Sequence, residues 1–432
     1  MVMIRAFRAL RPLPKFSTQV AAPPYDVLNW REAHEMARNN PYSFLHVSKP
    51  EIDLLDPQVP NAGKDFDFYQ RSVYLKGAAN LQKMISDKIF FQDSVPGLYF
   101  YQQRMGSHTQ CGITACFSVD EYNRNIIKKH ELTRRDKEDD RTRHIQALDA
   151  QSEPVFLFYN DGAGVGAGAS VAAGGDPIAT LMKKHIANHP PEYHFTSDDG
   201  IEHTLWVLTD GTLIQTLTGH FAQLKELYIA DGHHRSASAA RAASDVFESR
   251  HFLAVVFPSS QLKIMDYNRL LLSLNNHTEA GLLAKIQEKF DTSNLDGNAV
   301  NAVNSVNAIA NKEFAMYLGG KWIKLRPKIG TYTTTHPVES LDVSILQNNL
   351  LNPLFGITDP RIDKRIDFVG GIRGIGELVK RVDSGEAKVA FKLHPTSIQE
   401  LIKVADAGSM MPPKSTWFEP KLRSGLFVHT LH

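Results

Sequence analysis

The chain has 432 residues, of which 42% are hydrophobic and 22% are charged, and its formal net charge at pH 7 is +1. At roughly 100 to 200 residues per domain, this length predicts two or three domains, each large enough to bury a hydrophobic core. The balanced charge argues against a basic nucleic-acid-binding protein, and the charged and aromatic fractions differ from those of disordered chains.

The cysteines and the apolar runs argue against two further classes of protein. Cys111 and Cys116 lie five residues apart in the strand-like run CGITACFSV and would point to opposite faces of a strand, so neither a disulfide nor a zinc site is expected. The longest apolar runs, such as FLAVVF at 252–257, are far shorter than the roughly 20 residues that span a bilayer. We expect no membrane segment, and the cytoplasm is the default compartment.

The first 25 residues are basic, with four cationic side chains and no acid before Asp26. Organelle-targeting segments share this feature. The prolines before Tyr25 and the short apolar run favour a strand over residues 3–10 that leads into a proline-rich loop. Targeting stays open as the alternative.

Helical and strand-like segments are mixed along the chain and predict an α+β fold. Asn29 can cap a helix over 30–40, and further helices are expected at 69–87, 236–250, 282–290 and 298–312. Strand-like runs occur at 97–104, 110–119, 154–161, 203–210, 224–231 and 251–257, and a hairpin is expected at 313–327. The strand, Ala-rich helix and strand over 224–257 predict a βαβ element.

One low-complexity segment, DGAGVGAGASVAAGGDP at 161–177, contains small residues that cannot build a core. Gly164, Gly166 and Ala169 match the GxGxxA pattern of dinucleotide-binding loops, but the next helix is expected only after Pro177, too late to present its N-terminus to a phosphate. A surface insertion is therefore favoured.

The most informative motif is LYIADGHHRSASAARAA at 227–243, where a strand ends in Asp231 and Gly232 and a helix begins. The first N–H groups of a helix lack internal partners and carry the positive end of its dipole, so a phosphate is favoured there. Gly232 would allow a phosphate to approach the backbone closely, and Arg235 could bind phosphate oxygens through two parallel hydrogen bonds. Asp231 could hold hydrated Mg²⁺.

A purely structural interpretation of this motif has Asp231 capping the helix and the histidines in solvent. Capping does not account for His233, His234 and Arg235 in the first turn, where the dipole disfavours cations unless an anion binds. Zinc is disfavoured because adjacent histidines point in different directions and no further ligand pattern is present. Ligand binding is the favoured hypothesis.

The second motif is charge-dense: residues 130–144 hold five basic and five acidic side chains in fifteen positions. Pairs at helical spacing, Arg134 with Glu138 and Glu138 with Arg141, would suit a solvated helix without an apolar stripe. The same density would suit a site for a charged substrate and a metal. On that hypothesis Glu131 is the general base, and Arg134, Lys137 and Arg141 are partners for phosphate or carboxylate.

Four weaker signals leave loop structure and site open. VAAPPYDV at 20–27 forms a rigid turn that presents Tyr25 and Asp26, and LHVSKPEIDL at 45–54 carries His46 and Glu51. In MPPKSTWFEPK at 411–421, a proline precedes Lys414, so a Walker A motif is absent, but the loop could close over a ligand. GGIRGIGEL at 370–378 favours a tight strand-to-helix turn over a phosphate contact.

These motifs taken in order give a family resemblance. IRAFRALRP, PPYDV, KPEID, KKHELTRRDKEDDR, YIADGHHRSASA, MDYNRL and MPPKSTWFEPKL, spread from residue 4 to 422, resemble a large family filed as a domain of unknown function. That family is similar to the free L-serine kinases, which have a ParB/sulfiredoxin-type core and make O-phosphoserine.

The resemblance implies an ATP- or ADP-dependent kinase of this core with Mg²⁺ as cofactor and free serine as substrate. Its D-G-H-x-R segment maps to Asp231, Gly232, His233, His234 and Arg235 and binds nucleotide phosphates and metal, and an upstream glutamate, for which Glu131 is the candidate, takes the hydroxyl proton. The predicted site is completed by two groups of residues. The catalytic residues are Glu131, Asp231, His233 and Lys137, with Asp231 as the metal ligand; the nucleotide-binding residues are Gly232, His233, His234, Arg235, Ser236, Arg134, Arg141 and Lys414.

Further expectations complete this hypothesis. We expect a catalytic region over 1–275 and a C-terminal α+β region over 276–432 whose PPKST loop returns to the site. The alternatives are a nucleotide-binding or ParB-like DNA-binding regulator without kinase activity, and a phosphatase or nucleotidase that uses water. Nucleic acid and membrane partners are not expected, and a homo-oligomer stays open.

Overall fold

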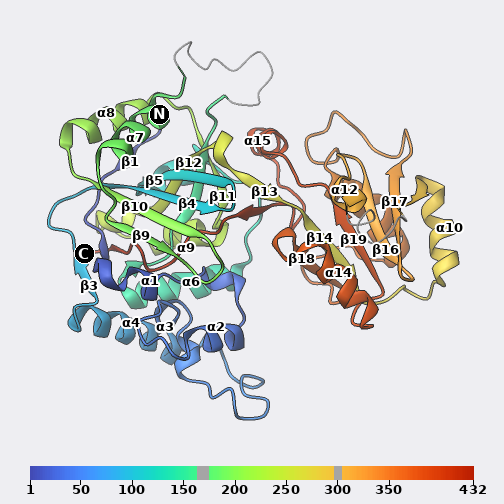
Figure 1. Ribbon diagram of the computed structural model, residues 1–432, viewed down its shortest axis with the longest axis horizontal. Coiled ribbons are helices and arrows are strands. Elements are labelled where there is room, and N and C mark those ends of the chain that lie inside the picture. Colours follow the sequence, from blue (N-terminus) through green and yellow to red (C-terminus); the bar gives the residue numbers. More distant parts are fainter. Residues whose placement is uncertain (163–174, 296–303) are drawn as a thin grey trace. The chain divides into compact units, whose positions relative to one another are not determined.

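The computed structural model describes residues 1–162, 175–295 and 304–432, coloured along the chain in Figure 1. Contacts divide it into two units. The first unit comprises residues 1–129, 133–262 and 420–432, and the second comprises 130–132 and 263–419. Most of the predicted insertion at 161–177, with its GxGxxA pattern, and part of the predicted helix at 298–312 lie outside the described residues. The expected functional division at residue 275 stays a prediction.

A nine-stranded sheet forms the centre of the first unit, in the order β6-β11-β8-β12-β5-β4-β10-β9 with β1 paired to β5. Its strands are β1 (Ile4–Arg5), β4 (Leu98–Met105), β5 (His108–Ser118), β6 (Ile127–Lys128), β8 (Val155–Tyr159), β9 (Tyr193–Thr196), β10 (Glu202–Leu208), β11 (Leu227–Asp231) and β12 (His251–Pro258). Two small pairs accompany it, β2 (Leu10–Pro12) with β3 (Phe90–Gln92) and β7 (Ala150–Gln151) with β21 (His429–Thr430). Since β1 belongs to the main sheet, the basic N-terminal segment is part of the fold.

Helices pack against this sheet, and in Figure 1 α7 and α8 lie together above it while α2, α3, α4 and α6 gather below it. The helices of the first unit are α1 (Ser17–Val20), α2 (Trp30–Ala37), α3 (Leu45–Ser48), α4 (Arg71–Ser86), α5 (Val119–Asn123), α6 (Arg135–Leu148), α7 (Pro177–Asn188), α8 (Gly211–Phe221) and α9 (His233–Ala242). The predicted cap is confirmed at α2, where Asn29 and Glu32 bond reciprocally to each other's backbone N–H groups.

The core of the first unit follows from the continuous apolar runs of its inner strands. All five residues of β8 are buried, as are all residues of β12 after His251. Strands buried on both faces show unbroken apolar runs instead of alternation. One large cluster joins strand residues such as Leu157 and Ala254 to α7, α8 and α9, and this cluster holds the strand ends that carry the candidate site.

The second unit is built on a six-stranded sheet in the order β15-β17-β16-β19-β14-β18. Its strands are β14 (Tyr267–Leu271), β15 (Phe290–Asn294), β16 (Phe314–Leu318), β17 (Lys321–Pro327), β18 (Ile366–Gly370) and β19 (Val389–Leu393), with β13 (Lys263–Met265) paired to β20 (Trp417–Glu419). Its helices in the described residues include α10 (Glu279–Lys289), α12 (Asp342–Leu346), α13 (Asn352–Phe355), α14 (Gly374–Asp383) and α15 (Ile398–Asp406). Both units mix helices with sheets, so the predicted α+β class is confirmed.

Three local predictions are wrong. The strands on either side of α9 do not form a βαβ element, because β8 lies between β11 and β12 and runs antiparallel to β11 but parallel to β12. The helix expected over 236–250 ends at Ala242, where the chain turns and Ser249 caps the backbone of Ser244. The strand expected over 3–10 is divided into β1 and β2.

No helix among residues 1–162, 175–295 and 304–432 is long and apolar enough to cross a membrane. Cys111 and Cys116 lie in β5 as expected; both are buried and neither forms a disulfide.

The central strand β8 gives a test of this core. Leu157 is fully buried, so truncation to Ala should lower the free energy of unfolding by about 2–5 kcal/mol, because it removes apolar contact and leaves a cavity. The matched control is Leu75→Ala on α4, where the side chain is 51% exposed and the loss should stay below about 0.5 kcal/mol. Equal losses in urea unfolding would contradict the core described here.

Candidate functional site

The predicted strand-turn-helix at 227–242 is confirmed. Strand β11 ends at Asp231, helix α9 begins at His233, and Gly232 between them has a φ of 95°. A side chain is strained at this angle, so glycine is required here by the backbone conformation. The first turn of α9 therefore presents its N–H groups directly after a strand end, which is the geometry that favours an anion.

Asp231 carries two hydrogen bonds that keep its carboxylate ionised. Its Oδ1 accepts from the Gly232 N–H at 2.7 Å, and its Oδ2 accepts from Lys421 Nζ at 2.8 Å. Burial alone would raise the pKa of Asp231, but the charges of Lys421 and Arg235 outweigh it and hold that pKa well below its ordinary value. The carboxylate is therefore negative throughout the neutral range.

Lys421 is held in place through its backbone. Gln103 Nε2 donates to the Lys421 carbonyl at 2.8 Å, and Gln110 Nε2 donates to the Pro420 carbonyl at 3.4 Å. Both glutamines are fully buried on β4 and β5. The central sheet thus positions the ammonium group that faces Asp231.

Arg235 is buried, with only 7% of its surface exposed. Its Nη1 donates to the Pro154 carbonyl at 3.0 Å, and its Nη2 donates to both oxygens of Asp26 at 3.1 and 3.2 Å. Because both terminal nitrogens have partners, the predicted two-pronged phosphate contact would require Asp26 to move. Its Nε is buried without a hydrogen-bond partner among the described residues.

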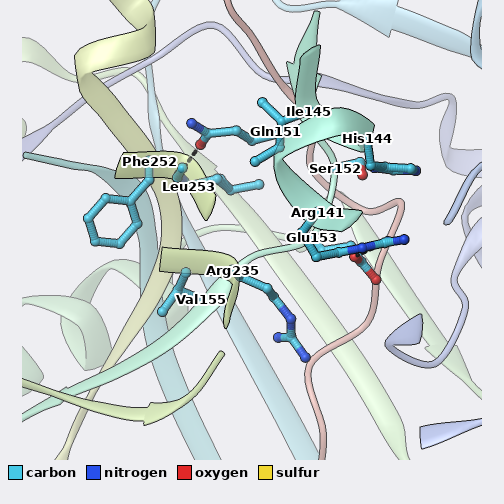
Figure 2. Close-up of a pocket in the computed structure, with 11 residues that line it drawn as sticks. Arg141, His144, Ile145, Gln151, Ser152, Glu153, Val155, Arg235, Phe252 and Leu253 are labelled. Carbon is cyan, nitrogen blue, oxygen red and sulfur yellow. Dashed lines mark hydrogen bonds and ion pairs between the residues drawn. The ribbon is translucent and has the colours of Figure 1, made fainter. Parts of the chain in front are cut away.

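Arg141 belongs to the same buried network and not to a solvated helix face. Its Nε donates to Asp140 at 3.0 Å, its Nη1 lies 3.6 Å from Glu153, and its guanidinium lies 4.1 Å from the centre of the Tyr25 ring. Figure 2 shows Arg141 beside Glu153, with Arg235 below them, around one pocket. The expected Glu138–Arg141 pair is not formed.

Glu153 ties this network to two further segments. It accepts from the Tyr25 N–H at 3.1 Å and from Ser424 Oγ at 3.2 Å. Burial raises the pKa of Glu153, and the charges of Arg141 and Arg235 oppose that rise. The carboxylate thus joins the PPYDV turn, helix α6 and the C-terminal segment, and it lies between two arginines.

The rest of the charge-dense segment makes contacts at the surface of the unit. Arg134 pairs with Asp136 at 2.7 Å instead of the expected Glu138, and Lys137 Nζ donates to the Tyr69 hydroxyl at 3.1 Å. The Arg134 N–H donates to His234 Nε2 at 3.0 Å, so this ring nitrogen is an acceptor. Burial is the largest of the effects that lower the pKa of His234.

The predicted site residues divide between the two units. The first unit brings together Asp231, Gly232, His233, His234, Arg235, Ser236, Arg134, Lys137 and Arg141. Ser236 is fully buried and its hydroxyl bonds back to the His233 carbonyl at 3.1 Å, inside the helix. Glu131 and Lys414 belong to the second unit, where the His130 carbonyl accepts from the Met411 N–H at 2.8 Å. The first three residues of the HELTRR motif, 130–132, therefore meet the segment of the PPKST motif there.

The motifs did not assign a role to four residues of the network. Lys421 and Glu153 face the site from distant segments, and Tyr25 and Asp26 come from the PPYDV turn, for which loop and site had stayed open. A lysine directly after the EP pair in the PPKSTWFEPK motif was the available signal for Lys421. No local pattern indicates Glu153.

The ion pair of Lys421 with Asp231 gives a pH-dependent test. An aspartate whose folded-state pKa is depressed contributes stability that is present above its unfolded pKa and lost as the pH falls. Lys421→Met should therefore destabilise the protein by about 1–3 kcal/mol at pH 7, and by less as the pH falls through the acidic range and Asp231 is protonated. Urea unfolding at several pH values measures both effects.

The exposed pair of Lys83 with Asp87 is the matched control. Lys83→Met should leave the stability at neutral pH close to that of the wild type, because exposed pairs contribute little. A loss in Lys421→Met that is the same at neutral and at acidic pH would show that the Asp231 charge is not the cause.

No curated protein matches the chain. Among solved structures, a free serine kinase in complex with AMP has 12% identity and a TM-score of 0.35 and covers 71% of this chain and 86% of its own. A conserved hypothetical protein from Pyrococcus furiosus has 12% identity and a TM-score of 0.34, with 72% and 93% covered. SbnI from Staphylococcus aureus, truncated at its C-terminus, has 12% identity and a TM-score of 0.34, with 71% and 82% covered.

The family comparison matches a somewhat longer part of the chain. A single family model matches residues 4–344, which include the PPYDV, HELTRR, ADGHHR and MDYNRL motifs. The chain therefore belongs to the family described as protein of unknown function, DUF1015.

Proposed function

We propose that this protein binds an adenine nucleotide at the Asp231–Arg235 turn and transfers a phosphoryl group to the hydroxyl of a small molecule, with free L-serine as the acceptor. The observation that carries the proposal is an ionised carboxylate at a strand end, directly followed by a positive-φ glycine and the N-terminus of a ten-residue helix. Phosphoryl transfer depends mainly on positioning and on charge neutralisation, and this turn offers both.

The phosphates would lie against the first turn of α9. The N–H groups of this turn and the helix dipole stabilise an anion by about 0.3–1 kcal/mol at an exposed site and by more where water is excluded. Lys421, 2.8 Å from Asp231, adds a positive charge at the same strand end. The turn thus supports binding of a negatively charged group although Asp231 itself is negative.

Asp231 fits a magnesium ion. Mg²⁺ in phosphate sites usually takes one or two carboxylates and completes its octahedral shell with phosphate oxygens and water. Asp231 provides one ionised carboxylate, and each of its oxygens accepts a single hydrogen bond in this turn. A bound Mg²⁺ would neutralise charge on the transferred phosphoryl group.

The remaining residues divide by their contacts. We assign Glu131 the role of base for the acceptor hydroxyl, and His233, His234, Lys137 and Arg134 the role of contacts to the nucleotide or the transferred group. The contacts of Arg141 and Arg235 with Glu153 and Asp26 support positioning of the PPYDV turn and of α9 rather than a direct phosphate contact. Lys414 stays assigned to nucleotide binding, on the basis of the PPKST motif.

Serine as the acceptor is supported by the ordered motifs and not by the distant structural likeness. A glutamate upstream of the DGHHR segment is the order that the resemblance to free serine kinases implies, and Glu131 stands in that place. Several of the similar structures are of a free serine kinase with AMP or ADP, and these nucleotides are ligands of that protein.

The direct test incubates the full chain with L-serine, Mg²⁺ and either ATP or ADP, and measures O-phosphoserine by mass spectrometry. We expect product with at least one nucleotide. Asp231→Asn and Glu131→Gln should each lower the rate about 100-fold or more, because each removes a charge that acts in the transition state.

Matched controls separate catalysis from folding. Asp245→Asn and Glu288→Gln change exposed acids outside the site and should keep the wild-type rate. Full activity in Asp231→Asn would contradict the assignment of the turn. Nucleotide hydrolysis without serine would instead indicate a phosphatase or nucleotidase.

A further inference from the structure

Arg269 is a buried cation that has no carboxylate partner among the residues that the structure describes. It lies in β14, within the MDYNRL motif, to which the proposed function gives no role. Only 4% of its surface is exposed, and among the described residues it forms no ion pair. Its guanidinium donates to two main-chain carbonyls, that of Tyr267 and, at 2.9 Å, that of Lys414.

The other buried arginines of the described residues show what is missing. Arg11, Arg141, Arg235 and Arg423 are each less than a tenth exposed, and each contacts at least one carboxylate, on Asp93, Asp140, Asp26 and Asp199 respectively. A buried charge without a counter-charge is strongly unfavourable. Burial lowers the pKa of Arg269 to about 10. The structure thus holds a cation whose counter-charge is absent from the described residues.

The nearest acid in the sequence does not supply this counter-charge. Asp266 Oδ2 accepts from Asn268 Nδ2 at 2.7 Å and lies 3.4 Å from Lys392 Nζ. Asn268 and Arg269 are neighbours in a strand, so their side chains point to opposite faces of the sheet. Asp266 is therefore engaged with Asn268 and Lys392, away from the guanidinium.

The Lys414 side chain and three aromatic rings lie beside Arg269 in the same unit. Lys414 Nζ is 5.6 Å from the centre of the Tyr267 ring, and Trp417 packs edge-on against that ring at 5.0 Å. The Phe368 ring lies 5.6 Å from the Arg269 guanidinium. Aromatic walls exclude water and strengthen the attraction between these cations and an anion.

The loop that carries Lys414 is held in a costly conformation. Lys414 has a φ of 58°, which non-glycine residues seldom adopt and which is found preferentially at functional sites. The loop is fixed at both ends, because Ser415 Oγ donates to the Pro412 carbonyl at 2.5 Å and Thr396 Oγ1 donates to the Ser415 carbonyl at 2.8 Å. Arg269 completes this frame through the Lys414 carbonyl.

We propose that Arg269 and Lys414 form an oxyanion-binding site in the second unit, which takes the carboxylate or phosphate group of a small molecule. Two of the guanidinium N–H groups bond to the backbone, and the rest of its five donors can bind the two oxygens of such a group. The site stands without the kinase. Only the identification of its ligand as the carboxylate of serine rests on the proposed function.

The test is calorimetric titration of the full chain with inorganic phosphate, L-serine and L-serinamide, which lacks the carboxylate. Binding of serine but not of serinamide assigns the site to a carboxylate, and Arg269-dependent binding of phosphate alone assigns it to a phosphate. Arg269→Met should lower the affinity for the oxyanion about tenfold or more, because it removes a charged, bidentate donor. Arg269→Lys, which keeps the charge, should give an intermediate loss.

Two further measurements make the outcome decisive. Arg381→Met removes an arginine of the same unit that already pairs with Asp367 and Glu386, and it should bind oxyanions as the wild type does. If the wild type forms no O-phosphoserine while Arg269→Met still loses oxyanion binding, the proposed function is rejected and this site is kept.

Circular dichroism and the thermal midpoint check that each variant folds; where Arg269→Met does not, Arg269→Lys decides. Wild-type affinity for every oxyanion in an Arg269 variant that folds, or no binding of any oxyanion by the wild type, would overturn the proposal.

Discussion

The ion pair between Lys421 and Asp231 is the contact on which the geometry of the candidate site depends. It joins the end of β11 to the C-terminal segment, 190 residues further along the chain. It also keeps the carboxylate ionised where burial would favour protonation. With Gly232 in its positive-φ conformation, the result is a fixed negative charge beside the positive end of a helix, which is an arrangement suited to a metal ion and a phosphate.

The charged side chains around this ion pair are compensated by other buried side chains of opposite charge. Arg235 joins α9 to Asp26 in the PPYDV turn, and Glu153 lies between Arg141 and the backbone of Tyr25. Removing one member would leave a partner buried without a counter-charge, which usually costs more than the pair itself contributes. The network therefore supports a rigid frame for the turn. Arg269 in the second unit differs from these residues, because it is buried and has no carboxylate partner among the described residues.

Local features of the site could be predicted from the sequence, because local chemistry determines them. An apolar strand that ends in Asp-Gly before small, helix-forming residues predicts a turn at that place. A cap at the start of α2 is likewise predicted from Asn29. The contacts of Lys421 and Glu153 could not be predicted, since their partners lie in distant segments. One interpretation of the charge-dense segment was a solvated helix, because the segment lacks an apolar stripe. Arg141 is nonetheless buried, because carboxylates from its own helix and from Glu153 compensate its charge.

Nucleotide phosphates bind at the start of α9 in the function proposed for this protein. A crystal structure of the full chain with ADP and Mg²⁺ would test this binding mode. We expect phosphate oxygens within hydrogen-bond distance of the N–H groups that follow Gly232, with the metal on the Asp231 carboxylate directly or through water. Phosphates bound elsewhere, with the Asp231–Lys421 pair unchanged and the first turn of α9 in solvent, would contradict it.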